Sequence, residues 1–295
     1  MDIQNLAAFT LVAETGSFSL AAQKLHLTQP AISKRIALLE DQLGTGLFDR
    51  IGRNISLTEA GQALLPHARA VQQELDAAAQ SVRDLSGTVA GQLRIATSHH
   101  IGLHRLPPVL SEFSTAFGGV KIDIDFMDSE QAYERIMQGK AELAVVTLAP
   151  VSEASLVTLP LWPDPLDFMV GRQHPLAQVA VQDLEALGEH TAILPGLNTY
   201  TGQIVAKLFD QHQLTLQVSM STNYLETIRM MASVGLGWTV LPRTMADESL
   251  TILRMRDIAI ERTLGIVYHR SRSLSRAARA FVEVLGGPTG TRPQH

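Results

Sequence analysis

The sequence predicts a chain of three parts: a small N-terminal unit of helices with a β-hairpin, one long helix, and a larger α/β domain. Apolar residues recur at helical spacing through residues 2–43, and a heptad repeat of apolar residues follows over residues 64–85. From residue 92 onward, strand-like apolar runs alternate with helical patterns, which is typical of parallel sheets covered by helices on both sides. The expected boundaries of the three parts are residues 1–58, 59–87 and 91–295.

The composition excludes several classes of protein. Of the 295 residues, 45% are hydrophobic and 18% are charged, which supplies a core and leaves too few charges for a disordered chain. The net charge is −5, from 24 Lys and Arg against 29 Asp and Glu, so bulk charge cannot bind nucleic acid, although local basic patches remain compatible with groove recognition. No cysteine is present, which excludes disulfides, thiolate metal sites, iron–sulfur clusters and cysteine nucleophiles.

The N-terminal segment carries no targeting or membrane signal. Asp2 stands where a signal peptide would carry a cation, and no apolar run approaches the ~18–20 residues of a membrane span. We therefore expect a soluble, cytoplasmic protein.

Capping residues divide the N-terminal unit into three helices. The first run of apolar residues at helical spacing ends at Gly16, and Ser17 can cap a second helix over residues 18–25 by accepting a bond from a free backbone N–H. Thr28 is a suitable cap for a third helix. Pro30 fits the first turn of that helix, because the N–H it lacks is not needed there.

The third helix has two different faces. Its apolar residues step by 4, 3 and 4, which predicts a core-facing side made of Ile32, Ile36, Leu39 and Leu43. The opposite side, near the N terminus, carries Gln29, Pro30, Ser33 and Lys34, with Arg35 alongside. Two helices joined by a tight turn, the second with an exposed polar half, make a helix-turn-helix that fits the major groove of DNA. The alternative is a three-helix packing unit whose polar face only meets water.

A β-hairpin is expected after the third helix. Residues 47–50 and 55–57 favour short strands, and Gly52 and Asn54 favour the turn between them. Arg50 and Arg53 would then lie near the hairpin tip, where the wing of a winged helix reaches a phosphate or the minor groove. The expected DNA-binding residues are Ser17, Thr28, Gln29, Pro30, Ser33, Lys34, Arg35, Arg50 and Arg53.

Many residues of this unit occur at a characteristic spacing along the sequence. The set is Phe9, Gly16-Ser17-Phe18, Ala21-Ala22, Leu25, Gln29-Pro30-Ala31-Ile32-Ser33, Ile36, Leu39-Glu40, Leu43-Gly44, Leu47-Phe48, Arg50 and Leu57-Thr58-Glu59-Ala60-Gly61. In these residues the sequence resembles the LysR-type transcriptional regulators. The resemblance implies a DNA-binding regulator of transcription that binds double-stranded DNA, and RNA polymerase is a further candidate partner.

The long helix is expected to begin after Thr58, with Glu59 in its first turn. A heptad seam along it consists of Leu64, Ala68, Val71, Leu75, Ala78, Val82 and Leu85. Such a seam favours pairing with the same helix of a second copy, which would place two recognition helices on half-sites about one helical turn (~34 Å) apart or a multiple of it. The alternative is a stripe that packs on its own domain. Pro66 favours a bend. The resemblance implies a homodimer through this helix and commonly a tetramer, whereas the sequence itself supports only the dimer.

The C-terminal part alternates strands and helices. Strands are expected at residues 93–97, 120–126, 143–146, 166–170, 192–194, 216–220 and 238–241, and helices near 129–138, 202–212, 224–234 and 275–285. The residues that extend the LysR resemblance here are Gly91-Gln92-Leu93-Arg94-Ile95, Leu106-Pro107-Pro108, Gly139-Lys140-Ala141-Glu142-Leu143-Ala144, His174-Pro175-Leu176 and Val234-Gly235-Leu236-Gly237-Trp238-Thr239-Val240-Leu241-Pro242. The resemblance implies two lobes with a cleft, like a periplasmic solute-binding protein: one of about 91–160 with 268–285, the other of about 161–267.

Polar residues follow several of these strands, where open α/β sheets bind ligands beside helix N termini. The strand-end segments are residues 97–100, 128–129, 147, 195–201 and 221–223. The expected effector-binding residues are Thr97, Ser98, His99, His100, Ser129, Thr147, Asn198, Tyr200 and Thr201, of which Ser98, Ser129, Asn198, Tyr200 and Thr201 are also implied by the resemblance. Hydroxyls, an amide and helix N–H groups suit a carboxylate or another small anion, and His99 and His100 add a pH-dependent charge. The alternative is that strand-end Ser and Thr only cap helices.

Metal and enzyme functions are not expected. His99, His100 and His104 are close in sequence, but adjacent histidines diverge and no carboxylate is suitably spaced nearby. Signatures of serine hydrolases, zinc proteases and phosphate loops are absent, and Gly235-Leu236-Gly237 lacks a third glycine and precedes a strand. We therefore expect no cofactor besides a small effector. The competing hypotheses are a solute-binding protein and a regulator with a vestigial cleft.

Overall fold

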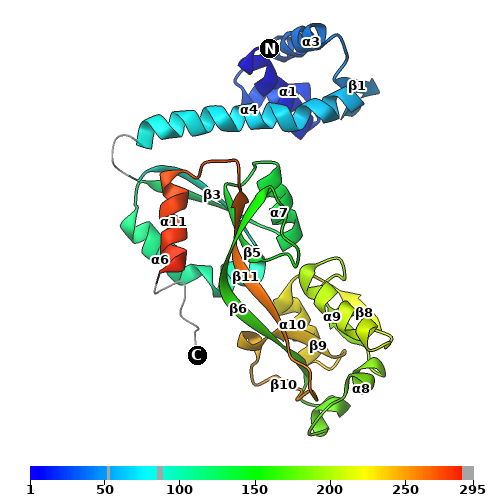
Figure 1. Cartoon of the computed structure of the whole chain (residues 1–295). Helices are drawn as coiled ribbons and strands as arrows, with labels where there is room; N and C mark the ends of the chain where they lie inside the picture. Colours follow the sequence, from blue (N-terminus) through cyan, green and yellow to red (C-terminus); the bar gives the residue numbers. More distant parts are fainter. Residues whose placement is uncertain (52–53, 85–88, 288–295) are drawn as a thin grey trace. The chain divides into compact units, whose positions relative to one another are not determined.

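Residues 1–51, 54–84 and 89–287 are described by a computed structural model of the chain (Figure 1). The chain divides into two compact units, Met1–Gly87 and Thr88–His295. Gly52 and Arg53, expected in the hairpin turn, and Leu85, expected at the end of the heptad seam, lie outside the described residues.

The first unit contains three short helices, a β-hairpin and one long helix. In chain order these are α1 (Ile3–Thr15), α2 (Phe18–Lys24), α3 (Gln29–Leu43), β1 (Phe48–Ile51), β2 (Asn54–Leu57) and α4 (Glu59–Asp84). β1 and β2 pair antiparallel, so the helix-turn-helix and its wing are both present. Asn54 pairs with Ile51 as the first residue of β2, whereas we expected it in the turn.

Local capping explains where these helices begin and end. Gly16 has a φ of +61° and its N–H bonds to the carbonyl of Val12, which ends α1. The hydroxyl of Ser17 accepts a bond from the N–H of Leu20 and caps α2, as expected. Thr28 precedes α3 but makes no capping bond with its side chain, so that expectation was wrong. The reason is local: Pro30 has no N–H to offer, and the N–H of Ala31 bonds to the backbone carbonyl of Thr28.

The core of the first unit lies between α1, α2, α3 and the hairpin. Phe48 of β1 meets the rings of Phe9 and Phe18, at centroid distances of 5.4 and 5.9 Å. The apolar side of α3 is buried at Ile32, Ile36 and Leu39. Leu43 was also expected in the core but is 39% exposed, because α3 ends there and Gly44 turns the chain away with a φ of +68°.

The long helix α4 packs on its own unit over its first turns only. Ala68 is buried in the core of that unit, Leu64 packs against it, and Arg69 pairs with Glu14 of α1 at 3.2 Å. Four later members of the seam are exposed, namely Val71, Leu75, Ala78 and Val82. The packing interpretation of the seam therefore holds for its first half, and the described residues of its second half are not covered by their own unit. The helix runs on through Pro66.

The second unit contains nine strands and seven α-helices within its described residues. Its strands are β3 (Gly91–Thr97), β4 (Val120–Phe126), β5 (Leu143–Thr147), β6 (Leu156–Gly171), β7 (Ala192–Leu194), β8 (Val218–Ser221), β9 (Thr239–Pro242), β10 (Leu250–Ile252) and β11 (Ile260–His269). Its helices are α5 (His99–His104), α6 (Leu106–Ala116), α7 (Ser129–Met137), α8 (Leu184–Gly188), α9 (Tyr200–Gln211), α10 (Leu225–Ser233) and α11 (Arg276–Gly286).

The large sheet is mixed, whereas we expected parallel sheets. Its order is β10-β6-β11-β5-β3-β4, and β9 also pairs with β6. β3 is parallel to β4 and β5, but β11 is antiparallel to β5 and β6, and β9 and β10 are antiparallel to β6. The reason is that β6 and β11 are long neighbouring strands that cross from one lobe to the other (Figure 1). Where β6 and β11 run side by side, only glycine fits at position 265, since a Cβ there would lie 2.4 Å from the carbonyl oxygen of Leu159.

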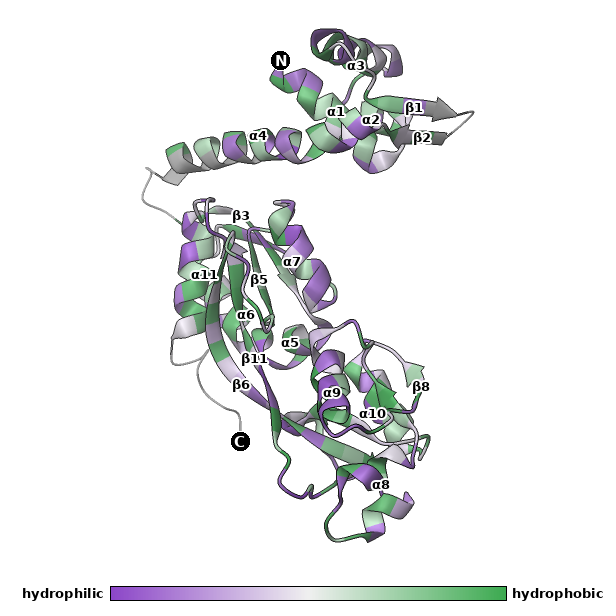
Figure 2. Ribbon diagram, turned by 45° about the vertical axis from the view of Figure 1, so that its right-hand side comes forward, coloured by the Kyte–Doolittle hydropathy of each residue, from purple (hydrophilic) through white to green (hydrophobic). Residues whose placement is uncertain are grey.

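The large sheet contributes strands to both lobes, β7 and β8 form a separate parallel pair, and in each lobe helices cover the strands on both sides. In lobe I, which contains β3, β4 and β5, α6 and α11 cover one face and α7 covers the other. In lobe II, which contains β7 to β10, α8 and α9 lie on one side of the strands and α10 on the other. Figure 2 shows hydrophobic strands in lobe I, and α7 and α11 with hydrophobic and hydrophilic residues in alternation, as expected for helices that bury one side.

Candidate functional site

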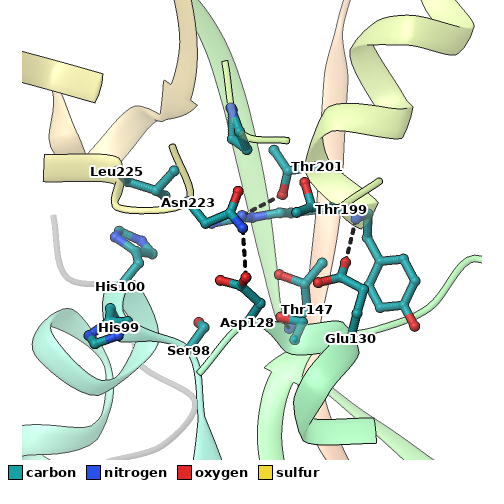
Figure 3. Close-up of a pocket in the computed structure, with 14 residues that line it drawn as sticks. Ser98, His99, His100, Asp128, Glu130, Thr147, Thr199, Thr201, Asn223 and Leu225 are labelled. Carbon is teal, nitrogen blue, oxygen red and sulfur yellow. Dashed lines mark hydrogen bonds between the residues drawn. The ribbon is translucent and has the colours of Figure 1, made fainter. Parts of the chain in front are cut away.

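A small polar pocket lies where the two lobes of the second unit meet (Figure 3). Lobe I contributes the end of β3, the N terminus of α7 and Thr147 at the end of β5, and lobe II contributes the N terminus of α9 and Asn223 before α10. These are carboxyl ends of strands and N termini of helices, the positions at which α/β folds bind ligands. The cavity measures about 50 Å³, which leaves room for only a few water molecules.

Direct hydrogen bonds join the two lobes across this pocket (Figure 3). The side-chain amide of Asn223 donates to Oδ2 of Asp128 at 2.6 Å. The oxygen of the same amide accepts a bond from the N–H of Gly196 at 2.9 Å, which fixes the amide orientation. The backbone N–H of Tyr200, at the start of α9, donates to Oε1 of Glu130 at 2.5 Å. The structure is therefore one in which the lobes touch at the cleft.

The charged residues that line the pocket are one buried cation, Arg262, and two carboxylates, Glu130 and Asp128. The guanidinium of Arg262 on β11 donates to Oδ2 of Asp164 at 2.8 Å and to the hydroxyl of Thr201 at 2.7 Å. Asp164 is almost fully buried and compensates the charge of Arg262. Burial raises the pKa of the Glu130 carboxyl above its usual value, against the bonds it accepts from backbone N–H groups. Asp128 is the second carboxylate.

Two histidines of α5 border the pocket, and His100 differs from our expectation. The His99 ring lies 5.5 Å from that of Phe126 and 4.7 Å from that of Tyr224, measured between centroids. His100 is 3% exposed, and burial lowers its pKa to about 3. Its ring is therefore neutral at physiological pH, so the expected pH-dependent charge is wrong for His100.

Most of the expected effector-binding residues line this pocket, and two do not. Those that line it are Ser98, His99, His100, Ser129, Thr147, Tyr200 and Thr201. Thr97 is fully buried instead, and its hydroxyl donates to the carbonyl of Val145 at 2.7 Å, tying β3 to β5. Asn198 is exposed and lies off the lining.

The hydroxyls that remain are held in different ways. Ser98 precedes α5 without a capping bond from its side chain, whereas the Ser129 hydroxyl accepts a bond from the N–H of Thr147 at 3.1 Å. Thr199 caps α9 by accepting a bond from the N–H of Gly202 at 3.1 Å. Capping, the alternative role for strand-end hydroxyls, thus applies to Thr199 and not to Ser98.

Seven lining residues are not among the expected effector-binding residues. Four of them lie within the expected strand-end segments, namely Asp128, Pro195, Thr199 and Asn223, whereas Glu130, Leu225 and Arg262 were missed altogether. Glu130 directly follows Ser129 in the first turn of a helix and could have been found from that position. Leu225 opens α10 directly after a strand-end segment. Arg262 lies on β11, a strand that we did not predict, so no local signal linked it to the cleft.

The recognition face of the first unit has the expected exposed polar character. Thr28, Gln29, Pro30 and Lys34 are exposed, and Ser17, Ser33 and Arg35 are partly exposed. The Gln29 amide donates to the Ser33 hydroxyl at 3.2 Å, and the Arg35 guanidinium donates to Oε1 of Gln4 at 2.7 Å. The backbone of Arg50 pairs with Ile55 in the hairpin.

A winged helix-turn-helix followed by a two-lobed domain with a polar cleft defines a class of ligand-responsive DNA-binding regulators. Residues 3–62 match the family described as bacterial regulatory helix-turn-helix protein, lysR family, and residues 86–287 match the LysR substrate binding domain. The chain belongs to the LysR family: it is a transcriptional regulator and not an enzyme. Among the described residues, no helix is long and apolar enough to cross a membrane.

Relatives and solved structures agree with this family. The HTH-type transcriptional activator CmpR of Synechocystis is 30% identical over 288 residues, 96% of this chain and 94% of that protein. A full-length OxyR variant from Pseudomonas aeruginosa has a TM-score of 0.74 at 23% identity, covering 99% of this chain and 100% of the other. Full-length CbnR in complex with its target DNA has a TM-score of 0.67 at 20% identity, covering 96% and 98%. These two structures show the fold alone.

Proposed function

We propose that this regulator is a dimer and that the α3 helix of each copy contacts duplex DNA. We further propose that a small anionic metabolite binds in the cleft between the lobes and changes how the dimer is arranged on DNA. The observation that carries the effector part is the bond from the N–H of Tyr200 to the carboxylate of Glu130. A helix N terminus attracts anions, and here a carboxylate of the protein already occupies that of α9. A metabolite carboxylate is the group that would compete for this place.

The DNA part rests on the exposed half of α3. Gln29 and Lys34 stand exposed near its N terminus, where a recognition helix contacts base edges. A Gln can pair with adenine and a Lys with guanine. Arg35 is tied to Gln4 of α1, so we assign it to positioning or phosphate contact. The structure of CbnR with its target DNA has the same fold.

The dimer part rests on the uncovered half of α4. Val71 and Leu75 are each 41% exposed and Val82 is 68% exposed, on one stripe of the helix. Apolar side chains in a heptad pattern that their own domain does not cover suit a second copy of the helix. We therefore place the dimer seam between Val71 and Val82. A tetramer is a further assembly that the family resemblance implies, and RNA polymerase is a further candidate partner.

The mechanism we propose is a population shift between two arrangements of the lobes. In one arrangement Glu130 holds the N terminus of α9 and the lobes touch. In the other, the anion of the metabolite replaces Glu130, and the contact between α7 and α9 is remade around the ligand. The metabolite shifts this equilibrium only by its difference in affinity for the two arrangements.

The test is a thermal-shift screen of small mono- and dicarboxylates on the full chain, followed by footprinting on its own upstream region with each positive compound. We expect a saturable rise in Tm with at least one anion and a changed footprint with the same compound. The matched variant is Thr201→Val, which removes a hydroxyl of the pocket and should weaken the response. A footprint that no anion alters, together with an unchanged Tm, contradicts the effector part and favours a vestigial cleft. A blank footprint at low ionic strength contradicts the DNA part.

A further inference from the structure

Two histidines and one glutamate meet beside the cleft. His100 and His104 lie four residues apart on α5, so their side chains project from the same side of the helix. Glu226 lies in the first turn of α10, 122 residues further along the chain than His104. One ligand atom from each of the three lies within 4.8 Å of the others. The expectation that no carboxylate stands near these histidines was wrong, because the fold brings the glutamate from the other lobe.

His100 has no hydrogen-bond partner for either ring nitrogen among the described residues, although it is 3% exposed. A buried imidazole normally has a hydrogen-bond partner for at least one of its nitrogens, since an unsatisfied buried polar group destabilises the fold. Its ring centroid lies 4.8 Å from that of His104.

The donor set fits a transition metal. Two imidazole nitrogens and one carboxylate oxygen are ligands that Zn²⁺ and similar divalent ions accept, with one position left open. Bonds of about 2.0–2.2 Å in a tetrahedral site place the ligand atoms about 3.3 Å apart. His104 Nε2 and Glu226 Oε1 are now hydrogen-bonded at 2.8 Å, so this pair would open slightly while the His100 ring turns inward.

The surroundings allow an ion to enter and to be held. The side chains of His104 and Glu226 are 45% and 36% exposed, so an ion can reach them from solvent. The guanidinium groups of Arg262 and Arg105 repel positive charge at His100. Both pair with Asp164, at 2.8 and 3.4 Å, which limits their repulsion of a metal ion.

We propose that His100, His104 and Glu226 bind a divalent transition metal ion of the zinc type, and that this ion cross-links the two lobes. α5 belongs to lobe I and α10 to lobe II, so a shared ion fixes their spacing at the edge of the cleft. Because His100 also lines the polar pocket, the ion would stand beside any bound effector. The proposal depends on neither the identity of that effector nor the DNA contacts.

The test uses Co²⁺ as a spectroscopic probe on the full-length protein, with Zn²⁺ as competitor. We expect one Co²⁺ per chain with the visible absorption bands of a four- or five-coordinate site, and loss of these bands when Zn²⁺ is added. Glu226→Gln and His104→Asn change exposed side chains and should each weaken Co²⁺ binding at least tenfold. His67→Asn, at an exposed histidine of α4, is the matched control and should bind like wild type.

Three outcomes overturn the proposal. If the wild-type protein does not bind Co²⁺ stoichiometrically, the proposed metal site does not exist. Equal binding by Glu226→Gln and wild type means that the two histidines act without the second lobe, which removes the cross-link. Equal loss in His67→Asn means that the probe reports surface histidines. In support, Zn²⁺ should raise the Tm of wild type and of His67→Asn, and leave the Tm of Glu226→Gln unchanged.

Discussion

The backbone N–H of Tyr200 in lobe II donates a 2.5 Å hydrogen bond to the carboxylate of Glu130 in lobe I. The bond places a carboxylate at the N terminus of α9, where it is favoured by the unpaired N–H groups of the first turn. Burial acts in the opposite direction and raises the pKa of Glu130. Ionisation of Glu130 and contact between the lobes are therefore coupled.

A first prediction concerns Glu130→Gln and pH. A carboxyl whose pKa is raised in the folded state reduces stability once pH exceeds the unfolded value of 4.5, and the reduction grows until pH passes the folded pKa. Glutamine has no charge and escapes this loss. The Tm of Glu130→Gln relative to wild type should therefore rise between pH 4.5 and pH 7.5. Glu189→Gln, at an exposed glutamate of lobe II, is the control. A difference that stays constant or falls with pH contradicts the buried-carboxylate assignment.

A second prediction concerns base reading by α3. Gln29→Ala should weaken binding at the cognate site by about 1–3 kcal/mol and relax the preference for one base pair, because a bidentate contact is lost. Titration of duplexes with single base-pair changes measures both effects. Gln42→Ala removes the same side chain at the exposed far end of α3 and should bind like wild type. Equal weakening of Gln29→Ala on random DNA would instead indicate a contact with the backbone.

A third prediction concerns the dimer seam. Leu75→Asp places a charge on the exposed stripe of α4, and because Leu75 is 41% exposed within its own unit, the fold of the chain should survive. The molar mass in sedimentation equilibrium should fall by half. Ala70→Asp adds the same charge at an exposed position of α4 outside the heptad positions and should leave the mass unchanged. A wild-type mass for Leu75→Asp refutes the seam.

The helices could be predicted closely from the sequence because their signals are local. Gly16 and Ser17 mark the end of α1 and the start of α2, and these signals need only neighbouring residues. Even the one failed cap, at Thr28, follows from its neighbour Pro30. The same locality explains why Ser98, Ser129 and Tyr200 were found: each follows a strand or opens a helix.

The crossing strands and the residues they carry could not be predicted. Pro160, Pro163 and Pro165 lie inside β6, and proline argues against a strand because it has no N–H for the ladder. Of β6 only residues 166–170 were predicted as a strand, so β11 lacked its long partner and Arg262 had no place at the cleft. Glu226 was missed for a related reason: its contact with His104 depends on how two lobes close, and no local pattern encodes that.

A fourth prediction tests the second contact between the lobes. Asn223→Asp replaces the amide that donates to Asp128 at 2.6 Å with a carboxylate, while the oxygen that accepts from Gly196 is retained. Two carboxylates then face each other, so a hydrogen bond becomes a repulsion that costs about 1–3 kcal/mol. The Tm should fall at neutral pH by about 2–4 °C for each kcal/mol.

The sign of the pH dependence identifies the cause of this loss. Each carboxylate raises the pKa of the other in the folded state, so the destabilisation appears as pH rises above the unfolded values and disappears as pH falls through the raised ones. Differential scanning calorimetry of Asn223→Asp and wild type across this range measures it. Asn198→Asp makes the same change at an exposed asparagine off the pocket. If both variants lose the same Tm, or if acid fails to restore Asn223→Asp, the contact between Asn223 and Asp128 does not hold the lobes together.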